Sequence, residues 1–150
     1  MKTLKYAIIL LFSAALMSCG SGDDKKVDDT KPTISLNSPI STVMITPGGV
    51  LNLNAVLSDD VELGEYIVKI TYRGSKSIKN VQEFYFNSRT DLDAYGNALP
   101  VVNGEKSFDL NFDIGVGTNA RVGHYSLIIT AIDQSENVTE EMVQFEIVRP

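Results

Sequence analysis

Apolar and polar residues alternate with a period of two over most of the chain from residue 32 onward. The apolar positions of the alternating segments are Ile34 and Leu36; Leu51, Leu53, Ala55 and Leu57; Tyr66, Val68, Ile70 and Tyr72; Phe108, Leu110, Phe112 and Ile114; Tyr125, Leu127, Ile129 and Ala131; and Val143, Phe145 and Ile147. Successive side chains of a β-strand point to opposite faces, so each apolar set shares one face. No segment of this region keeps the i, i+3, i+4, i+7 spacing of an amphipathic helix. The pattern therefore predicts half-buried β-strands with one wet face.

Turn residues divide these segments into short strands. Thr46-Pro47-Gly48-Gly49 suits a tight turn, because Pro presets φ and Gly accepts a positive φ. Residues 42–45 predict a short piece of edge strand just before it. Short strands separated by such turns predict an all-β fold, an antiparallel two-sheet β-sandwich of about seven strands.

The longest break in the alternation lies at residues 74–104. Its aromatic piece, Phe84-Tyr85-Phe86, predicts an additional strand. Asn103-Gly104 has the composition of a two-residue hairpin turn. We therefore expect an extra strand and a long excursion in this region.

The N-terminal residues predict export and a flexible connection. Lys2 and Lys5 precede an apolar run over residues 6–17, which is the layout of a signal peptide over residues 1–18 and too short for a membrane span with polar flanks. Residues 19–31 are acidic and have almost no apolar content, so they predict a flexible tether that buries no core. Residues 32–150 suffice for one domain.

The end of the signal, Leu16-Met17-Ser18-Cys19, resembles the bacterial lipobox. The resemblance implies that Cys19 is lipidated and holds the protein in membrane lipid, where acyl chains contribute about 0.8 kcal/mol per buried methylene. Acidic residues close behind Cys19 resemble the surface-export signal of Bacteroidota lipoproteins. That resemblance implies a cell-envelope protein anchored to the outer membrane and facing the exterior. The alternative is an ordinary secretory signal with a chance cysteine.

The charge balance restricts the partners. Removing Lys2 and Lys5 from 13 basic residues leaves 11 against 19 acidic ones, a net charge of −8. Nucleic-acid phosphates need Lys and Arg, so we expect no nucleic-acid partner.

A second resemblance lies in residues 123–133, which read Gly-His-Tyr-Ser-Leu-Ile-Ile-Thr-Ala-Ile-Asp. This run is similar to the penultimate strand of immunoglobulin-like and fibronectin-type domains. The resemblance implies an immunoglobulin-like sandwich in which Tyr125 forms a tyrosine corner, its hydroxyl bonded back to the main chain. Asp133 and the following residues resemble the turn of bacterial immunoglobulin-like modules, except that Glu136 stands where those have Gly.

The whole layout resembles small Bacteroidota lipoproteins with a single immunoglobulin-like domain of unknown function. The matching pieces are Lys31-Pro32-Thr33-Ile34, Leu57-Ser58-Asp59-Asp60 with Leu63, and residues 123–133. Members of that family often carry several histidines after the strand that corresponds to residues 67–70. This chain has none there, so a metal role based on those histidines does not carry over.

Catalytic groups are scarce in the sequence. His124 is the one histidine, and we interpret it as a surface residue facing away from Tyr125. No nucleophile elbow, zinc-ligand set or phosphate-binding glycine loop is present. We expect the protein not to be an enzyme and to need no cofactor.

Calcium is the one metal that the sequence brings into consideration. Two predicted turns carry hard oxygen ligands: Asp59, Asp60 and Glu62 in one, and Asp133, Glu136 and Asn137 in the other. Turns that follow two such strands can meet at one end of a sandwich and hold Ca²⁺. The alternative is that Asp and Asn serve as turn formers that bond their own backbone.

Residues 74–104 are the predicted binding surface, because long loops on a rigid sandwich commonly carry function. The predicted binding residues are Tyr85, Tyr95, Lys76, Lys79 and Arg89. In the alternative, Phe84 and Phe86 point inward and only Tyr85 is free. We expect a non-catalytic binding or accessory module for a protein or a glycan. The alternatives are a structural spacer without a specific ligand and an enzyme with an unrecognised site.

Overall fold

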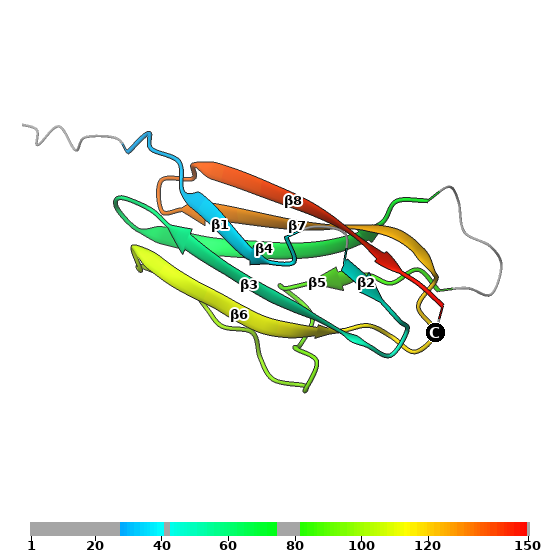
Figure 1. The fold of residues 1–150 in the computed structure, drawn as a ribbon. Helices are drawn as coiled ribbons and strands as arrows, with labels where there is room; N and C mark the ends of the chain where they lie inside the picture. Colours follow the sequence, from blue (N-terminus) through cyan, green and yellow to red (C-terminus); the bar gives the residue numbers. More distant parts are fainter. Residues whose placement is uncertain (1–27, 41–42, 75–81, 150) are drawn as a thin grey trace, which may run out of the picture.

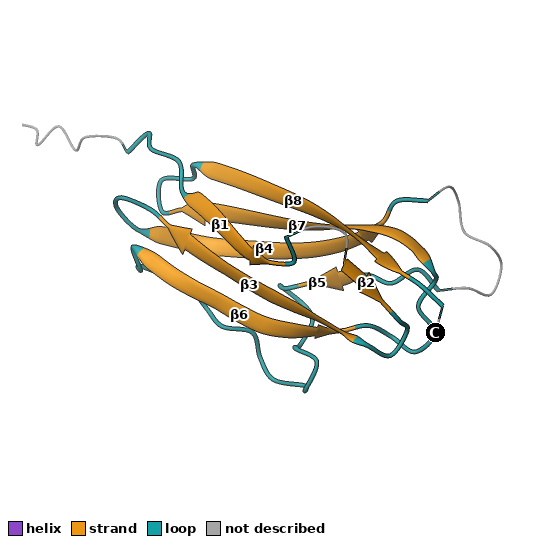
Figure 2. Cartoon of the chain, in the orientation of Figure 1, coloured by secondary structure: helices purple, strands orange, loops and turns teal. Residues whose placement is uncertain are grey.

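The computed structural model describes residues 28–40, 43–74 and 82–149 (Figure 1). Over these residues the chain forms eight β-strands and no helix (Figure 2). The strands are β1 (Thr33–Ser38), β2 (Val43–Ile45), β3 (Val50–Ser58), β4 (Leu63–Tyr72), β5 (Phe86–Asn87), β6 (Ser107–Gly115), β7 (Gly123–Asp133) and β8 (Val138–Ile147). The predicted all-β class is confirmed.

The strands pack as two layers (Figure 1). Within the described residues, one sheet has the order β1-β3-β6 and the other the order β2-β8-β7-β4-β5. Neighbouring strands are antiparallel except β2 and β8, which are parallel. The chain changes sheet between β1 and β2, just after the cis peptide bond Ser38-Pro39. The predicted two-sheet sandwich is confirmed, and the short strands β2 and β5 bring the described strands to eight.

The inward faces of the two sheets form the core. Along β3, the apolar residues from Leu51 to Leu57 are buried at every second position, while Asn52 between them is exposed. The largest fully buried side chains are Tyr125, Phe145, Leu53, Leu57, Leu63, Ile70, Leu110, Ile114, Leu127, Ile129, Ile147 and Val68. Burying one large aliphatic side chain contributes about 1.5–3 kcal/mol, so the alternation determines which face of each strand turns inward.

The outward face of the three-stranded sheet carries short amide and carboxylate side chains. Asn52 on β3 lies opposite Asp113 on β6, and Asn54 lies opposite Asn111. The Asn52 side-chain amide donates to Asp113 Oδ1 at 2.8 Å and to Asn111 Oδ1 at 3.3 Å. Asn37 on β1 donates to Asn54 at 2.9 Å. Hydrogen bonds thus join polar side chains across all three strands.

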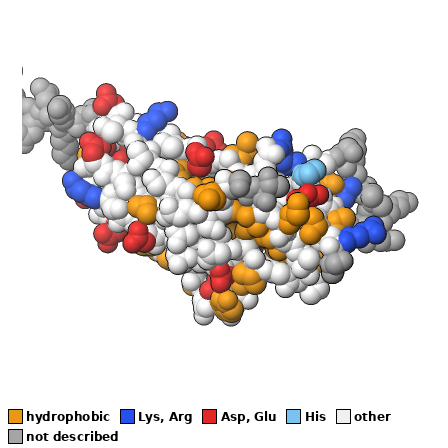
Figure 3. Space-filling view, viewed as in Figure 1, with side chains coloured by type: hydrophobic (Ala, Val, Ile, Leu, Met, Phe, Trp, Pro, Cys, Tyr) orange, Lys and Arg blue, Asp and Glu red, His pale blue; other side chains and the backbone are white. Residues whose placement is uncertain are grey.

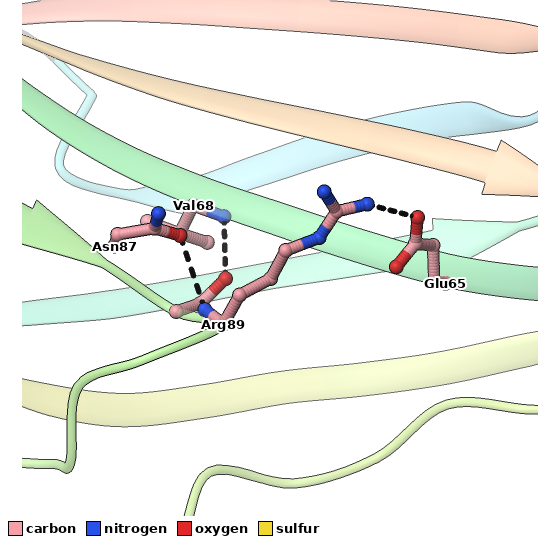
Figure 4. A network of polar contacts seen from close by, with 5 residues as sticks. Glu65, Val68, Asn87 and Arg89 are labelled. Carbon is pink, nitrogen blue, oxygen red and sulfur yellow. Dashed lines mark hydrogen bonds and ion pairs between the residues drawn. The ribbon is translucent and has the colours of Figure 1, made fainter.

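The connection between β5 and β6 is the long excursion that the sequence predicts. Its first residues lie against β4, where the main-chain N–H of Val68 donates to Ser88 Oγ at 2.8 Å and Arg89 pairs with Glu65 (Figure 4). Beside these contacts, Asn87 Oδ1 accepts from the main-chain N–H of Arg89 at 3.1 Å. These contacts fix the first turn of the excursion against the five-stranded sheet.

The hairpin predicted at Asn103-Gly104 is wrong. Gly104 has a positive φ of 77°, but its N–H donates to the carbonyl of Leu63 at 2.9 Å. The residues before it do not form a strand, because Pro100 has no N–H and Val102 is buried against the core instead. Asn103-Gly104 therefore forms a bend in a loop, not the turn of a hairpin.

Candidate functional site

Tyr125 lies at the centre of an aromatic cluster at one end of β7. Its hydroxyl donates to the carbonyl of Arg121 at 2.7 Å and accepts from the N–H of Phe84 at 3.3 Å. Its ring stacks on Phe145 and meets the Tyr72 ring edge-on, with centroids 5.5 and 5.2 Å apart. Burial raises the pKa of the Tyr125 hydroxyl. This is the geometry of a tyrosine corner, and it is structural because the Tyr125 side chain is fully buried.

Arg121 closes this cluster from the outside. Its guanidinium carbon lies 4.3 Å from the centroid of the Tyr72 ring, and its Nη1 pairs with Glu83 at 3.2 Å. Only 9% of Arg121 is exposed. The Arg121 guanidinium therefore contacts both the Tyr72 ring and the Glu83 carboxylate, and it is part of the packing at this end of the sandwich.

Three of the predicted binding residues line three neighbouring hollows, some of whose lining residues are shared. Arg89 lines a hollow with Tyr66 and residues 98–102, and Tyr85 lines another with Phe84. Tyr95 lines a third, over the outward face of β3 and β6. The predicted residues Lys76 and Lys79 lie outside the described residues. The prediction of one surface made by all five residues therefore stays a prediction.

Phe84, Tyr85 and Phe86 alternate in burial. Phe86 is buried and Phe84 packs against the core, while Tyr85 is 56% exposed. This is the inward-facing alternative that the sequence allows. Arg89 is held by its ion pair with Glu65, and its side chain is 53% exposed.

The turn that carries Tyr95 is fixed by Asp93. Asp93 Oδ1 accepts from the N–H groups of Tyr95 and Asn97 at 2.9 and 2.7 Å, and its Oδ2 accepts from the Asn97 amide at 2.9 Å. These hydrogen bonds, those from Asn97 first, lower the pKa of the Asp93 carboxyl. Asp93 therefore stays ionised and holds the loop that presents Tyr95.

Tyr95 itself reaches across to the three-stranded sheet. Its hydroxyl donates to Asp113 Oδ2 at 3.0 Å, and this hydrogen bond together with the charge of Asp113 raises the pKa of Tyr95. The residue is nevertheless 72% exposed. One edge of the ring is thus tied down while most of the side chain faces solvent.

The hollow beside Tyr95 has a volume of about 480 Å³ and is open to solvent. It is lined by Asn52, Asp93, Tyr95, Ala98, Leu99, Pro100, Asn111, Phe112 and Asp113. Figure 3 shows hydrophobic side chains beside acidic ones where the β5–β6 connection projects, next to a mostly uncharged surface over β3 and β6. We call this surface, made by Tyr95, Asp93, Asp113, Asn52 and Asn111, the Tyr95 surface.

Sequence reasoning found Tyr95 but missed the four polar residues around it. Asn and Asp are depleted in strands, yet Asn52, Asn111 and Asp113 occupy outward strand positions. That local excess of amides and carboxylates is the signal that could have pointed to this face.

A group of three carboxylates lies at the opposite end of the sandwich from the C-terminus. One oxygen each from Asp28, Asp59 and Asp133 lies within 4.8 Å of the other two. Figure 1 shows why: the start of the described chain, the β3–β4 turn and the β7–β8 turn share this end. Asp59 and Asp133 were predicted to meet, whereas Asp28 was assigned to the tether. Asp60 is exposed and is not one of the three.

Several predictions concern residues beyond these surfaces. His124 is exposed, as expected for a surface histidine. The signal peptide, Cys19 and the first part of the predicted tether lie outside the described residues. In the portion that is described, no helix has the length and hydropathy to cross a membrane.

The two-sheet topology and the bond of Tyr125 to Arg121 define an immunoglobulin-like β-sandwich. The chain belongs to the family described as domain of unknown function (DUF4625), whose model matches residues 17–148. No curated protein matches the sequence.

Several solved structures have a similar fold. The fibronectin(III)-like modules of CbhA from Clostridium thermocellum are 16% identical over 79% of this chain and 47% of that one, with a TM-score of 0.46. A family 123 glycoside hydrolase from Clostridium perfringens is 15% identical over 81% and 28%, with a TM-score of 0.46. Murine CRIg is 13% identical over 80% and 100%, with a TM-score of 0.41. The chain spans less than half the length of the two clostridial structures, and these likenesses concern the fold alone.

Proposed function

We propose that this protein is a non-catalytic binding module that takes a glycan on the Tyr95 surface. The observation that carries the proposal is Tyr95 itself, an aromatic residue that is 72% exposed and yet oriented by its bond to Asp113. An aromatic ring offers a large contact area, and an oriented ring binds with little loss of side-chain entropy.

The chemistry of the surrounding side chains favours a sugar over an apolar ligand. The C–H face of a pyranose packs on an aromatic ring, and its hydroxyls need short polar partners around that ring. Asp93 and Asp113 supply carboxylate acceptors, and Asn52 and Asn111 supply amides. The hollow is open and broad, which suits a chain end or a branch rather than a deeply buried small molecule.

The structural spacer is the second candidate, because an acidic sandwich with a polar outer face is soluble without a ligand. An enzyme is supported least, since the one histidine is exposed and lies on β7 rather than beside Asp93 or Asp113. A glycan-binding experiment separates the spacer from the proposed binding module.

We further propose that Cys19 is lipidated and tethers the module to the outer membrane, facing the exterior. The sequence Leu16-Met17-Ser18-Cys19 and the acidic residues behind it support this placement. The family match starts at residue 17, so it takes in Cys19 together with the domain. In cells, Cys19→Ala should move the protein from the detergent phase to the aqueous phase on phase separation. Retention of the variant in detergent would place the anchor elsewhere.

The binding proposal is tested on a glycan array with the full-length protein in detergent micelles. Wild-type protein should be retained on a subset of glycans, and Tyr95→Ala should lose that retention without a change in melting temperature. Tyr85→Ala is the matched control, because Tyr85 is also exposed but lines a different hollow. If no glycan retains the wild type, or if Tyr95→Ala binds equally well, the spacer function is favoured instead.

A further inference from the structure

We propose that Asp28, Asp59 and Asp133 form a calcium site that fastens the incoming chain to the domain. The three carboxylates come from three separate segments: the residues before β1, the turn after β3 and the end of β7. This inference is independent of the Tyr95 surface.

The spacing of the oxygens fits a single ion. Calcium binds oxygen at about 2.3–2.6 Å, so two ligands of one ion lie up to about 5 Å apart. One oxygen from each of Asp28, Asp59 and Asp133 lies within 4.8 Å of the others. Three hard carboxylates without a sulfur or imidazole ligand are the donors that calcium prefers.

Asp59 gives an independent indication of a ligand. Its Oδ1 accepts the N–H groups of Val61 and Glu62, both at 2.9 Å. Its Oδ2 is buried and has no hydrogen-bond partner among the described residues, and Asp59 as a whole is only 9% exposed. A buried carboxylate oxygen is stabilised by a donor or a cation, and this one shares its end of the sandwich with two further carboxylates.

Among the described residues, no basic side chain neutralises these charges. Neither of the two ion pairs in the described residues includes the three acids. Lys106, which comes close, donates its Nζ to the main-chain carbonyl of Asp60 at 2.8 Å instead. Three like charges at this spacing repel one another, and a divalent cation removes that repulsion.

Asn137 positions two members of the site. Its side-chain amide donates to Asp133 Oδ2 at 2.8 Å and to the main-chain carbonyl of Asp28 at 3.1 Å. The Asp28 segment is therefore already held against the β7–β8 turn. An ion shared with Asp59 would hold the Asp28 segment there more firmly.

The test uses the full-length protein in detergent, treated with a chelator and then titrated with calcium chloride or magnesium chloride. Calorimetry should show one calcium per chain, with a dissociation constant on the order of 10⁻⁴–10⁻³ M, the range of extracellular sites. The melting temperature should rise by roughly 3–10 °C at about 10 mM calcium. Magnesium should have a much smaller effect, because it loses its hydration water reluctantly.

Three variants distinguish the site from general screening. Asp28→Asn and Asp59→Asn should abolish the calcium response. Asp59→Asn should not lower the melting temperature without calcium, because its amide replaces the unpartnered oxygen with a donor. Asp60→Asn is the matched control, an exposed neighbour outside the cluster, and should respond like the wild type. The proposal is overturned if the wild type shows no calcium heat, or if Asp60→Asn loses as much as Asp28→Asn.

Hydrogen exchange tests the fastening itself. Calcium should slow the exchange of the amides in residues 28–31 of the wild type and leave that of Asp28→Asn unchanged. If calcium binds but these amides exchange at the same rate, the ion does not fasten the incoming chain.

Discussion

The hydroxyl of Tyr125 donates a 2.7 Å hydrogen bond to the main-chain carbonyl of Arg121, four residues earlier in the chain. The same oxygen accepts the N–H of Phe84, so one buried group joins β7, the segment before it and the segment before β5. Gly123, between Arg121 and Tyr125, allows the Tyr72 ring to pack closely on this segment, because a Cβ there would lie 2.9 Å from that ring and its φ is 138°. The corner thus links residues far apart in the sequence.

Tyr125→Phe should lower the free energy of unfolding by about 1–2 kcal/mol. The variant keeps the ring packing but removes one buried hydrogen bond and leaves the N–H of Phe84 without its partner. Urea denaturation should show a lower midpoint at an unchanged slope. Tyr85→Phe is the control, because Tyr85 is 56% exposed and its hydroxyl only accepts an exposed 3.4 Å bond from the Asn87 side chain. Coincident midpoints for Tyr125→Phe and the wild type would contradict the structural role of the corner.

Tyr66 makes stability depend on pH in the alkaline range. Burial raises its pKa from 10.0 to about 12, and its hydroxyl donates to the carbonyl of Pro100 at 2.7 Å. Because the folded pKa is the higher one, the folded state keeps the proton longer than the unfolded state. This contribution is fully present below pH 10 and is lost as the pH rises from about 10 to 12.

The ionisation of Tyr66 should lower the free energy of unfolding by on the order of 1–2 kcal/mol as the pH approaches about 12. Urea midpoints of the wild type and Tyr66→Phe, measured at several pH values from about 8 to 11.5, isolate it from the other titrating groups. The difference between the two proteins should stay constant up to about pH 10 and then shrink. A difference that is independent of pH would show that Tyr66 ionises equally in both states.

Glu136→Gly should stabilise the domain by about 0.5–1 kcal/mol. Glu136 has a φ of 68°, a left-handed conformation that costs a non-glycine residue about 1–2 kcal/mol, part of which glycine returns as unfolded-state entropy. Glu136→Ala is the matched control, because it removes the charge but keeps a Cβ. In urea denaturation without divalent cations, the midpoint of Glu136→Gly should be higher than the midpoints of Glu136→Ala and the wild type. Equal midpoints for the Gly and Ala variants would show that the backbone at residue 136 is unstrained.

The strands could be predicted because burial repeats with the same period as the side chains. Leu53 is fully buried and Asn52 beside it is exposed, as a two-residue period requires. The short turns could also be predicted from their Pro, Gly and Asn residues, apart from Asn103-Gly104. There the composition suits a bend, but Val102 is buried in the core and the residues directly before Asn103 form no strand.

The two candidate sites were only partly predictable, because each depends on contacts between distant segments. Asp28 gives no hydrophobic signal, since hydrogen bonds rather than apolar burial hold it on the domain. Asp60 follows Asp59 in sequence but is exposed, because successive side chains in a turn point in different directions. The bond between Tyr95 and Asp113 joins a loop to a strand 18 residues later, and the loop path that allows it is set by Asp93.

Tyr95→Phe distinguishes two contributions of Tyr95 to glycan binding. One is the stacking of its ring on the sugar, and the other is the orientation of the ring by Asp113. The variant keeps the ring but loses the bond to Asp113, so the ring must be ordered by the ligand. Losing one hydrogen bond of about 0.5–1.5 kcal/mol predicts an affinity for a retained glycan that is about 2–10-fold weaker than wild type. Tyr95→Ala, which also loses the stacking surface, should be weaker still.

Calorimetric titration with the glycan that the array identifies measures these differences directly. Tyr85→Phe should bind like the wild type, because Tyr85 lines a different hollow. The melting temperatures of all variants should agree, since Tyr95 is 72% exposed and its side chain adds little to the core. If Tyr95→Phe binds as tightly as the wild type while Tyr95→Ala does not, the ring alone carries recognition and the bond to Asp113 has no part in it. If Tyr95→Phe instead binds as weakly as Tyr95→Ala, orientation by Asp113 dominates, and Asp113→Ala should reproduce the loss.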